Sequence, residues 1–377
     1  MLSAGVGFSI ATDPKQAAIA AAEAAIATCA SPSAALAFVS GDYGADLGLL
    51  LDALRGALGT RAVVGATAQG VVGAGREVEG TQGVSVLAID GLDSQAFLLP
   101  DLSQADVSAE LAAQTGGARP EDLVILLPDP AAMRAERLLA DLREELSGAA
   151  VVGAGAATDA SGRARQWCGE EIETGALAGL VLRGATPPQI GVTQACRPVS
   201  EVHHVTRTEG NWILEIDGRP ALDLFCEAAG GALADDLRRA AMYVLVAFPR
   251  CEKEPLAPGR YLVRHLVGFS ERNRALAIPE LVAVGDAIAF VHREPETARQ
   301  DLKEMLGRLD PSGAACGIWL NCCARGAGFF GVPGLEAAYL EQALGSTPVA
   351  GMFGSCEIGP VAGRTELLTY TGVLALL

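Results

Sequence analysis

The sequence is poor in lysine and histidine and has no long apolar run. Only three of its 377 residues are lysine and four are histidine, and the formal net charge at pH 7 is −17. A chain this acidic is repelled by phosphate backbones and by anionic lipid, so we expect neither nucleic-acid nor membrane partners. No stretch reaches the roughly 18 apolar residues of a spanning helix, and the first residues show no leader pattern. We therefore expect a cytoplasmic location.

The sequence also lacks the familiar catalytic and zinc-binding motifs. Its nine cysteines are scattered without C-x-x-C spacing, which is typical of reduced thiols rather than of a disulfide framework or a zinc site. No H-E-x-x-H, G-x-S-x-G or G-K-[ST] pattern occurs. We therefore assign no catalytic residue, no metal ligand and no resident cofactor, and we do not predict an enzyme.

Small apolar residues dominate what is present. Half of the chain is hydrophobic and 45 residues are glycine, a composition that hints at a GC-rich bacterial genome. The length predicts two domains, or one large duplicated unit. The segment Gly-Ala-Thr-Pro-Pro at 184–188 is typical of a loop and indicates a domain boundary. It divides an N-terminal domain, residues 1–184, from a C-terminal domain, residues 185–377.

Residues 5–90 and 287–377 show the same order of expected elements, which indicates an internal duplication. Each copy reads as a strand, a helix, a second strand, a glycine-bearing loop, a second helix, a third strand, a glycine-rich loop and a closing strand. The equivalent landmarks are Phe8 and Phe290 in the first strands, and Pro14 and Pro295 in the helix starts. The acid before each proline can cap the first turn of its helix.

The repeated pattern predicts the fold class. A third, partial copy lies at 123–183, with a strand, a helix, a strand and a glycine loop in the same order. The closing strand follows too short a connection for a parallel crossover, so the sheets should be mixed. We predict an α/β protein built of internally duplicated strand-helix units, with helices packed outside and two pseudo-equivalent halves. Residues 185–285 read instead as hairpin strands, with one helix that breaks at Gly230-Gly231.

Two loops of the last copy carry the candidate ligand-binding residues. If their strands are neighbours, the loops 321–326 and 354–359 meet at one sheet edge, where α/β proteins commonly bind ligands. Arg325 would clamp a carboxylate or phosphate, and Glu357 would accept a ligand amine. Alternatively, these two side chains pair with each other. The candidates in these loops are Asn321, Cys322, Arg325, Gly326, Ser355, Cys356 and Glu357.

Further candidates lie in the equivalent loops and in a nearby strand. Thr67, Gln69 and Gly70 occupy the N-terminal counterpart of the second loop. The three cysteines of the last copy (Cys322, Cys323, Cys356) suit a redox sensor, a soft-metal site or merely small buried thiols. Arg264 either reaches the pocket or forms a structural salt bridge with Asp217 or Asp286.

Several blocks, in order, resemble the FIST family (F-box and intracellular signal transduction). The blocks are VVGATAQGVV with GVSVLAI, EIDGRPALD, GRYLVRHLVG, FVHREPETARQDL, CCARGAGFFGVPGLEAAYL, PVAGMFGSCEIGPV and TYTGVLAL. The resemblance covers nearly the whole chain and implies FIST N-terminal and C-terminal domains, the core of the latter at 217–360. Arg264 matches an arginine typical of the family.

The resemblance implies a cytoplasmic sensory protein that binds a small, perhaps amino-acid-like, ligand and signals alone or through a separate partner protein. Two alternatives stay open. Some bacterial relatives are described as haem-binding nitric-oxide sensors, which would make His203, His204 or His265 the axial ligand. The third reading is a protein-interaction module that binds no small ligand.

Overall fold

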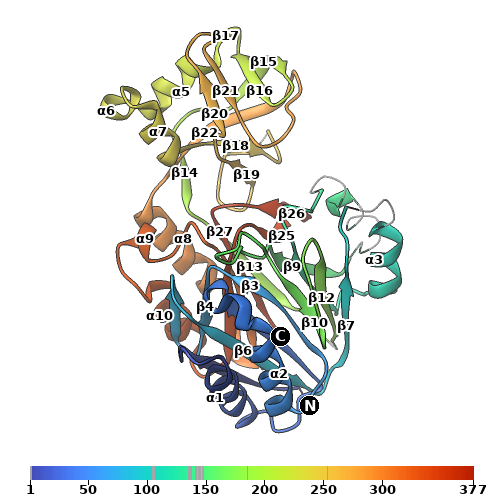
Figure 1. Cartoon of the computed structure of the whole chain (residues 1–377). Helices are drawn as coiled ribbons and strands as arrows, with labels where there is room; N and C mark the ends of the chain where they lie inside the picture. Colours follow the sequence, from blue (N-terminus) through green and yellow to red (C-terminus); the bar gives the residue numbers. More distant parts are fainter. Residues whose placement is uncertain are drawn as a thin grey trace.

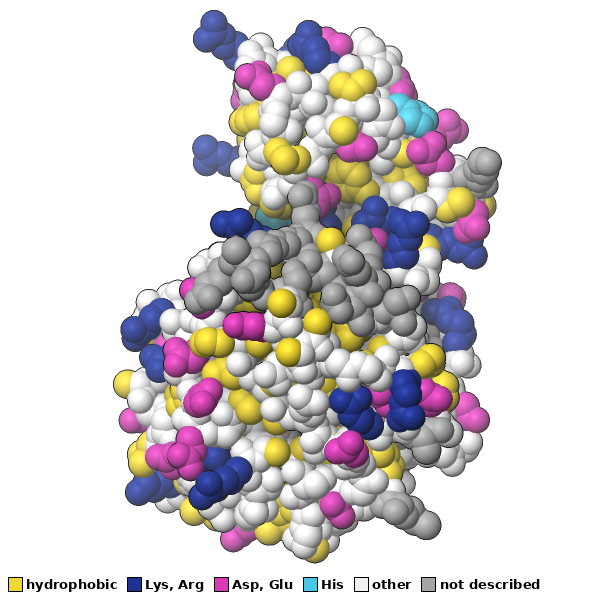
Figure 2. All heavy atoms as spheres, turned by 90° about the vertical axis from the view of Figure 1, so that its right-hand side faces the viewer, with side chains coloured by type: hydrophobic (Ala, Val, Ile, Leu, Met, Phe, Trp, Pro, Cys, Tyr) yellow, Lys and Arg dark blue, Asp and Glu magenta, His cyan; other side chains and the backbone are white. Residues whose placement is uncertain are grey.

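The computed structural model consists of a larger body and a smaller lobe, joined at a narrower waist (Figure 1, Figure 2). It describes residues 2–377 apart from 104–106, 135–137, 141, 143–145, 147, 185 and 253. Acidic and basic side chains are interspersed over both parts on the face in Figure 2. The described residues on that face therefore form no extended basic surface for a polyanion.

The first unit of the body alternates strands and helices as its sequence predicts. Its elements are β1 (Ser3–Ser9), α1 (Pro14–Ile26), β2 (Ala34–Ser40), the 3-10 helix η1 (Gly41–Asp46), α2 (Leu47–Leu58), β3 (Val63–Ala68), β4 (Gly70–Gly73), β5 (Arg76–Glu79) and β6 (Val84–Asp90). Helix α1 begins as expected, because Pro14 stands in its first turn and the side chain of Asp13 accepts the N–H of Gln16 at 2.8 Å.

The second unit follows directly and has the same order of strands. Its elements are β7 (Asp93–Leu99), α3 (Val107–Thr115), β8 (Leu123–Pro128), β9 (Ala150–Ala154), β10 (Gln166–Cys168), β11 (Glu171–Glu173) and β12 (Leu177–Arg183). The helix expected between β8 and β9 lies partly on residues outside those described, and residues 138–140 and 142 of it are helical. The expected domain boundary also touches Ala185, which is not described.

The third unit is interrupted by the lobe. Its elements are β13 (Gln189–Gln194), α8 (Pro295–Gly307), the 3-10 helix η2 (Pro311–Gly313), β23 (Gly317–Cys322), α9 (Ala327–Phe330), α10 (Leu335–Leu344), β24 (Val349–Gly354), β25 (Glu357–Val361), β26 (Arg364–Leu368) and β27 (Thr371–Leu376). Glu294, the acid expected to cap α8, makes no capping bond. Its carboxylate instead accepts hydrogen bonds from Arg197 and Thr297.

All three units share one strand topology. In each, the first strand is antiparallel to the last, the last is antiparallel to the second, and the second is parallel to the third. The orders are β1-β6-β2-β3, β7-β12-β8-β9 and β13-β27-β23-β24. The mixed sheets predicted from the short closing connection are confirmed, and the partial third copy is a complete unit.

Each sheet is completed by a hairpin from another unit. Hairpin β4-β5 of the first unit pairs with β24, β10-β11 of the second pairs with β3, and β25-β26 of the third pairs with β9. The exchange is cyclic, so every unit donates one hairpin and receives one. It covers the otherwise open edge of each parallel pair, which would be free to pair with other chains.

The core has a central part and three outer parts. Phe38 on β2, Leu127 on β8 and Leu320 on β23 hold equivalent register positions, and all three are buried in one central cluster. The opposite faces of the sheets pack against helices in separate clusters, one for each unit. Helices consequently lie on the outside of the body, as predicted (Figure 1).

The alanine-rich helix α1 lies unusually close to strand β1. Its buried positions are all alanine (Ala17, Ala18, Ala21, Ala22 and Ala25). On β1, a methyl group at Gly7 would overlap the carbonyl oxygen of Ala21, and one at Gly5 would overlap that of Ala25. Small residues on both surfaces therefore allow the helix and the strand to approach closely.

The lobe is a sheet of short strands with helices on one side (Figure 1). Its elements are β14 (Cys196–Pro198), β15 (His203–Glu209), β16 (Trp212–Ile216), β17 (Arg219–Pro220), α5 (Ala221–Ala229), α6 (Gly231–Ala234), α7 (Leu237–Tyr243), β18 (Val244–Pro249), β19 (Tyr261–Arg264), β20 (Gly268–Ser270), β21 (Ala275–Ala277) and β22 (Ala287–Arg293). The expected helix break is confirmed at Gly230-Gly231, both of which have positive φ.

One correspondence drawn from the sequence is wrong. Phe290 was expected to match Phe8 of β1, but its strand β22 belongs to the lobe sheet, between β18 and β15. The true counterpart of β1 is β13, which precedes the lobe in the sequence and pairs with β27. The error arises because β22 is the strand that leads directly into α8, so local order mimics the first copy.

Candidate functional site

The two candidate loops of the third unit do meet at one sheet edge. Strands β23 and β24 are parallel neighbours, with Cys322 opposite Gly354. The N–H of Cys323 donates to the carbonyl of Gly354 at 2.8 Å, which ties one loop to the other. We call this region the carboxyl-edge cluster and define it by residues 321–326 and 354–357.

Arg325 is fully buried and binds a carboxylate that the sequence did not point to. Its Nε and Nη2 donate to Oε1 of Glu336, in the first turn of α10, at 3.0 and 2.6 Å. The side-chain amide of Asn321 donates to the other oxygen of Glu336. The pairing of Arg325 with Glu357, considered as the alternative to a pocket role, is replaced by pairing with Glu336, and the guanidinium neutralises a charge within the fold.

Glu357, the other charged candidate, is also fully buried. Its Oε2 accepts the hydroxyl of Thr371 at 2.6 Å, whereas its Oε1 has no partner among the described residues. Burial, followed by the neighbouring Cys322, raises the pKa of the Glu357 carboxyl well above its ordinary value. This favours the neutral acid, which is a poor partner for a ligand amine.

The N-terminal candidates hold the units together. Thr67 donates its hydroxyl to the carbonyl of Ala157 at 2.6 Å and accepts the N–H of Arg165 at 3.0 Å. The N–H of Gln69 donates to the carbonyl of Phe353 at 2.9 Å. Gly70 begins the exchanged strand β4 and lies opposite Phe353.

The remaining loop candidates are engaged in the same way. Ser355 donates its hydroxyl to the carbonyl of Ala156 at 3.2 Å. Cys356 is buried, and its carbonyl accepts the N–H of Gly155 at 2.8 Å. A methyl group at Gly326 would overlap the carboxylate of Glu79 on the exchanged strand β5. The glycine loops thus close this end of the body by bonding to one another.

Arg264 lies in the lobe, on β19, and is buried. Its Nε donates to Glu280 at 2.8 Å, and its Nη1 donates to the carbonyl of Val263 at 2.9 Å. The salt bridge expected as the alternative to a pocket role exists, but its acid is Glu280 rather than Asp217 or Asp286.

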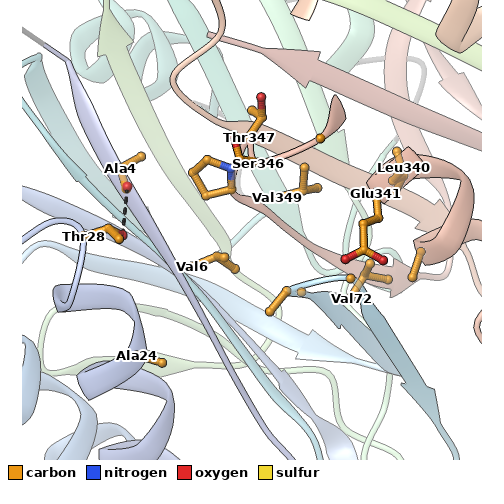
Figure 3. Close-up of a pocket in the computed structure, with 16 residues that line it drawn as sticks. Ala4, Val6, Ala24, Thr28, Val72, Leu340, Glu341, Ser346, Thr347 and Val349 are labelled. Atoms are coloured by element: carbon orange, nitrogen blue, oxygen red, sulfur yellow. Dashed lines mark hydrogen bonds between the residues drawn. The ribbon is translucent and has the colours of Figure 1, made fainter. Parts of the chain in front are cut away.

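A cavity that the sequence did not indicate lies at the opposite edge of the third sheet. It has a volume of about 410 Å³ and lies between the first and third units (Figure 3). We call it the inter-unit cavity. Its lining comprises Ala4, Val6, Ala24, Thr28, Val72, Gly73, Ala74, Gly75, Ala337, Leu340, Glu341, Gly345, Ser346, Thr347, Pro348 and Val349. None of the eleven ligand-binding candidates is among these residues.

Glu341 is the one charged side chain among the residues that line this cavity. Figure 3 shows its carboxylate entering from α10 towards Val72 and the turn after β4. In that turn Gly75 has φ +69°, and a Cβ there would lie 2.8 Å from Glu341 Oε1. Glycine therefore leaves room for the carboxylate. Glu341 is an exposed residue of the helix, so the sequence gave no signal that separated it from other helix-surface glutamates.

The rest of the lining combines hydroxyl groups with apolar walls. Thr28, Ser346 and Thr347 supply hydroxyls, and the hydroxyl of Thr28 donates to the carbonyl of Ala4 at 3.3 Å. Val6 and Val349 lie on opposite walls, from β1 and from the start of β24 (Figure 3). A concave, half-apolar surface with a few convergent polar groups is typical of small-molecule sites.

The histidines considered for haem are held by carboxylates on the lobe. Nδ1 of His203 lies 2.8 Å from Asp217, and Nε2 of His204 lies 3.3 Å from Glu252. His265 is exposed, just after β19. None of the three lines the inter-unit cavity, so no observation on the described residues favours an axial ligand among them.

The described residues form neither a metal-ion site nor a membrane-spanning helix. No group of three or more His, Cys, Asp or Glu side chains in that part of the chain is arranged to hold a metal ion, which leaves the soft-metal reading of the cysteines without support. None of its helices has the length and apolar character needed to cross a membrane.

The chain is similar to two known domain families and to mycobacterial proteins. The FIST N domain matches residues 33–219, and the FIST C domain matches residues 221–360. An uncharacterized protein of Mycobacterium tuberculosis is 32% identical over 383 residues, covering 99% of this chain and 98% of that protein. An uncharacterized protein of Mycobacterium bovis is 31% identical, with the same coverage. These similar proteins are bacterial and match the chain from end to end.

Proposed function

The chain belongs to the FIST family, and from that premise we propose that it is a sensory protein whose input is a small ligand carrying an amine. FIST domains are associated with sensory and signal-transduction proteins and are not a known enzyme family. The observation that carries the proposal is the inter-unit cavity with its single carboxylate, Glu341. Carboxylates hold ammonium groups by charge-assisted hydrogen bonds.

The lining favours one ligand class over others. It offers no cationic side chain that would bind a ligand carboxylate or phosphate. This argues for an amine with an apolar body rather than for a zwitterionic amino acid or a nucleotide. The volume of about 410 Å³ lies within the range of sites for small metabolites.

We place the ligand in the inter-unit cavity rather than in the carboxyl-edge cluster. Arg325 and Glu357 are fully buried there, and the loops are sealed by their mutual hydrogen bonds. Binding at this edge would first require the Arg325–Glu336 pair to open. Binding in the cavity requires no such break, so the carboxyl-edge assignment stays a prediction with the weaker support.

The position of the cavity also links ligand binding to the arrangement of the first and third units. Its walls come from β1, α1 and β4 of the first unit and from α10 and β24 of the third. A ligand that contacts both units favours one relative arrangement of the two. We propose that a separate signalling protein reads this arrangement, and that the protein acts in the cytoplasm, where its nine free cysteines stay reduced.

A thermal-shift screen of primary amines and polyamines, with matched carboxylic acids as controls, tests the proposal. A ligand at one hundred times its dissociation constant should stabilise the protein by about 2.7 kcal/mol. The shift should disappear in Glu341→Gln and in Ser346→Trp, which fills the mouth of the cavity. It should persist in Glu304→Gln on α8, a residue outside the lining. Amines that shift the wild type and Glu341→Gln equally would refute the assignment.

A further inference from the structure

Two adjacent cysteines stand at the end of strand β23. Cys322 is the last residue of the strand and is buried, whereas Cys323 begins the following turn and is exposed. A third thiol, Cys356, lies in the facing loop and is buried. The pair therefore joins one exposed cysteine to a buried one.

The two thiols differ in their hydrogen bonds and in the direction of their pKa shifts. The Cys322 sulfur accepts the N–H of Tyr370 at 3.3 Å. Interaction between the two neighbouring thiol groups lowers the pKa of Cys323 and raises that of Cys322. Of the two thiols, Cys323 therefore loses its proton more readily.

The other cysteines with shifted pKa values contrast with Cys323. Burial raises the pKa of Cys29, Cys168, Cys196, Cys226, Cys316 and Cys356. A low-pKa, accessible thiol with a second thiol next to it is the usual arrangement of a redox-sensing cysteine.

The turn that contains Cys323 also contacts the lobe. The guanidinium of Arg293, the last residue of β22, donates to the carbonyl of Ala324. It lies 4.3 Å from the ring centroid of Phe329 and 5.5 Å from that of Tyr370. A covalent change at Cys323 would therefore occur one residue from a contact that joins the lobe to the body.

We propose that Cys322 and Cys323 form a dithiol that is oxidised by hydroperoxides, with Cys323 as the attacking thiol and Cys322 as the resolving thiol. The Cys323 thiolate attacks the terminal oxygen of the hydroperoxide. An S–O bond forms, the O–O bond breaks, and the departing alkoxide takes up a proton to become an alcohol. Cys323 is then a sulfenic acid.

The second step completes a two-electron oxidation. The Cys322 sulfur attacks the sulfur of the Cys323 sulfenic acid and forms a disulfide. The S–O bond breaks, and the hydroxyl leaves as water with the proton from Cys322. In total, two thiols are oxidised to one disulfide, and the hydroperoxide is reduced to an alcohol and water.

The test is a titration of the whole chain with hydrogen peroxide, followed by counting of free thiols and peptide mapping. In the wild type, two of the nine thiols should be lost and the peptide should contain a 322–323 disulfide that dithiothreitol reverses. In Cys323→Ser no thiol should be lost at the same dose. Cys251→Ser, which removes another exposed cysteine, should behave like the wild type.

A trapping experiment assigns the two roles. In Cys322→Ala, dimedone should label Cys323, because the sulfenic acid has no resolving thiol. If that variant does not fold, dimedone labelling of Cys323 in wild-type protein quenched early in the reaction serves instead. Equal oxidation of Cys323 and Cys251, or a disulfide that maps to Cys323–Cys356, would overturn the assignment.

Discussion

Replacing Glu77 by glutamine should remove a pH-dependent loss of stability. Glu77 lies on β5, the strand that the first unit contributes to the third sheet, and its carboxylate accepts the N–H of Ala337 at 3.0 Å. Burial raises the pKa of Glu77 to about 7, and the negative charges of Glu336 and Glu79 add to the effect. Of these acids, Glu336 forms an ion pair with Arg325.

The sign of the effect follows from the direction of the shift. The folded protein binds a proton at Glu77 between its ordinary pKa of 4.5 and about 7, where the unfolded chain has already released it. The free energy of unfolding therefore falls as pH rises through this window. A shift of this size corresponds to about 3 kcal/mol. That contribution is fully present below pH 4.5 and is lost above pH 7.

Glu77→Gln keeps an acceptor for Ala337 but cannot ionise. Its unfolding free energy should equal that of the wild type at pH 4.5 and exceed it by about 2–3 kcal/mol at pH 8. Urea titrations followed by tryptophan fluorescence suit the measurement, because Trp167 and Trp319 are buried in the body. Only the difference between variant and wild type is needed, so groups that titrate in both proteins cancel.

The control for this experiment is Glu173→Gln. Glu173 is exposed on β11, the equivalent strand of the hairpin that the second unit donates. Its stability should follow that of the wild type at every pH. A constant difference between Glu77→Gln and wild type from pH 4.5 to pH 8 would refute the reasoning, and so would a difference of the opposite sign.

Three further predictions concern packing, charge and the exchanged hairpins. Gly7→Ala should destabilise the protein by about 2 kcal/mol or more in urea titrations, because its methyl overlaps helix α1. Gly56→Ala, in a helix with open space, should instead stabilise it by up to about 1 kcal/mol, and equal effects would contradict the close packing. Arg325→Met should cost about 3 kcal/mol or more, and adding Glu336→Leu should recover most of it; an additive double variant would argue against the pair. A fragment of residues 1–184 should show no cooperative melting in circular dichroism, because β4-β5 loses β24 and β9 loses β25; a sharp transition would show that the exchange is dispensable.

The strand-helix order of the first and third units was largely predictable because it depends on neighbours along the chain. The start of α1 is an example, since Asp13 and Pro14 act on amides within one turn. The juxtaposition of the loops after β23 and β24 was also predictable, because parallel neighbours place their carboxyl ends together. The order of elements along the chain was misleading at one point. The inserted strand β22 stands directly before α8, so it was assigned the position that β13 holds in the structure.

The partners of charged groups were less predictable. Arg325 and Glu357 belong to the same pair of loops, so the sequence suggested a contact between them. In the structure Arg325 binds Glu336, because the first turn of α10 packs over the end of β23. Similarly, Arg264 binds Glu280 instead of either of the two aspartates considered. These choices depend on the packing angle of whole elements, which no short pattern records.

The sequence alone therefore determined the family, the α/β alternation, the mixed sheets and the meeting of the glycine loops, since each rests on periodicity, capping or motif order within short stretches. Only the tertiary structure decided the cyclic exchange of hairpins, the burial of Arg325 and Glu357, and the inter-unit cavity around Glu341. The physical reason is that a short stretch of sequence does not show which other element will pack against the edge of a strand or the outer face of a helix. What covers them is fixed by contacts between units that lie hundreds of residues apart, such as Glu77 with Ala337.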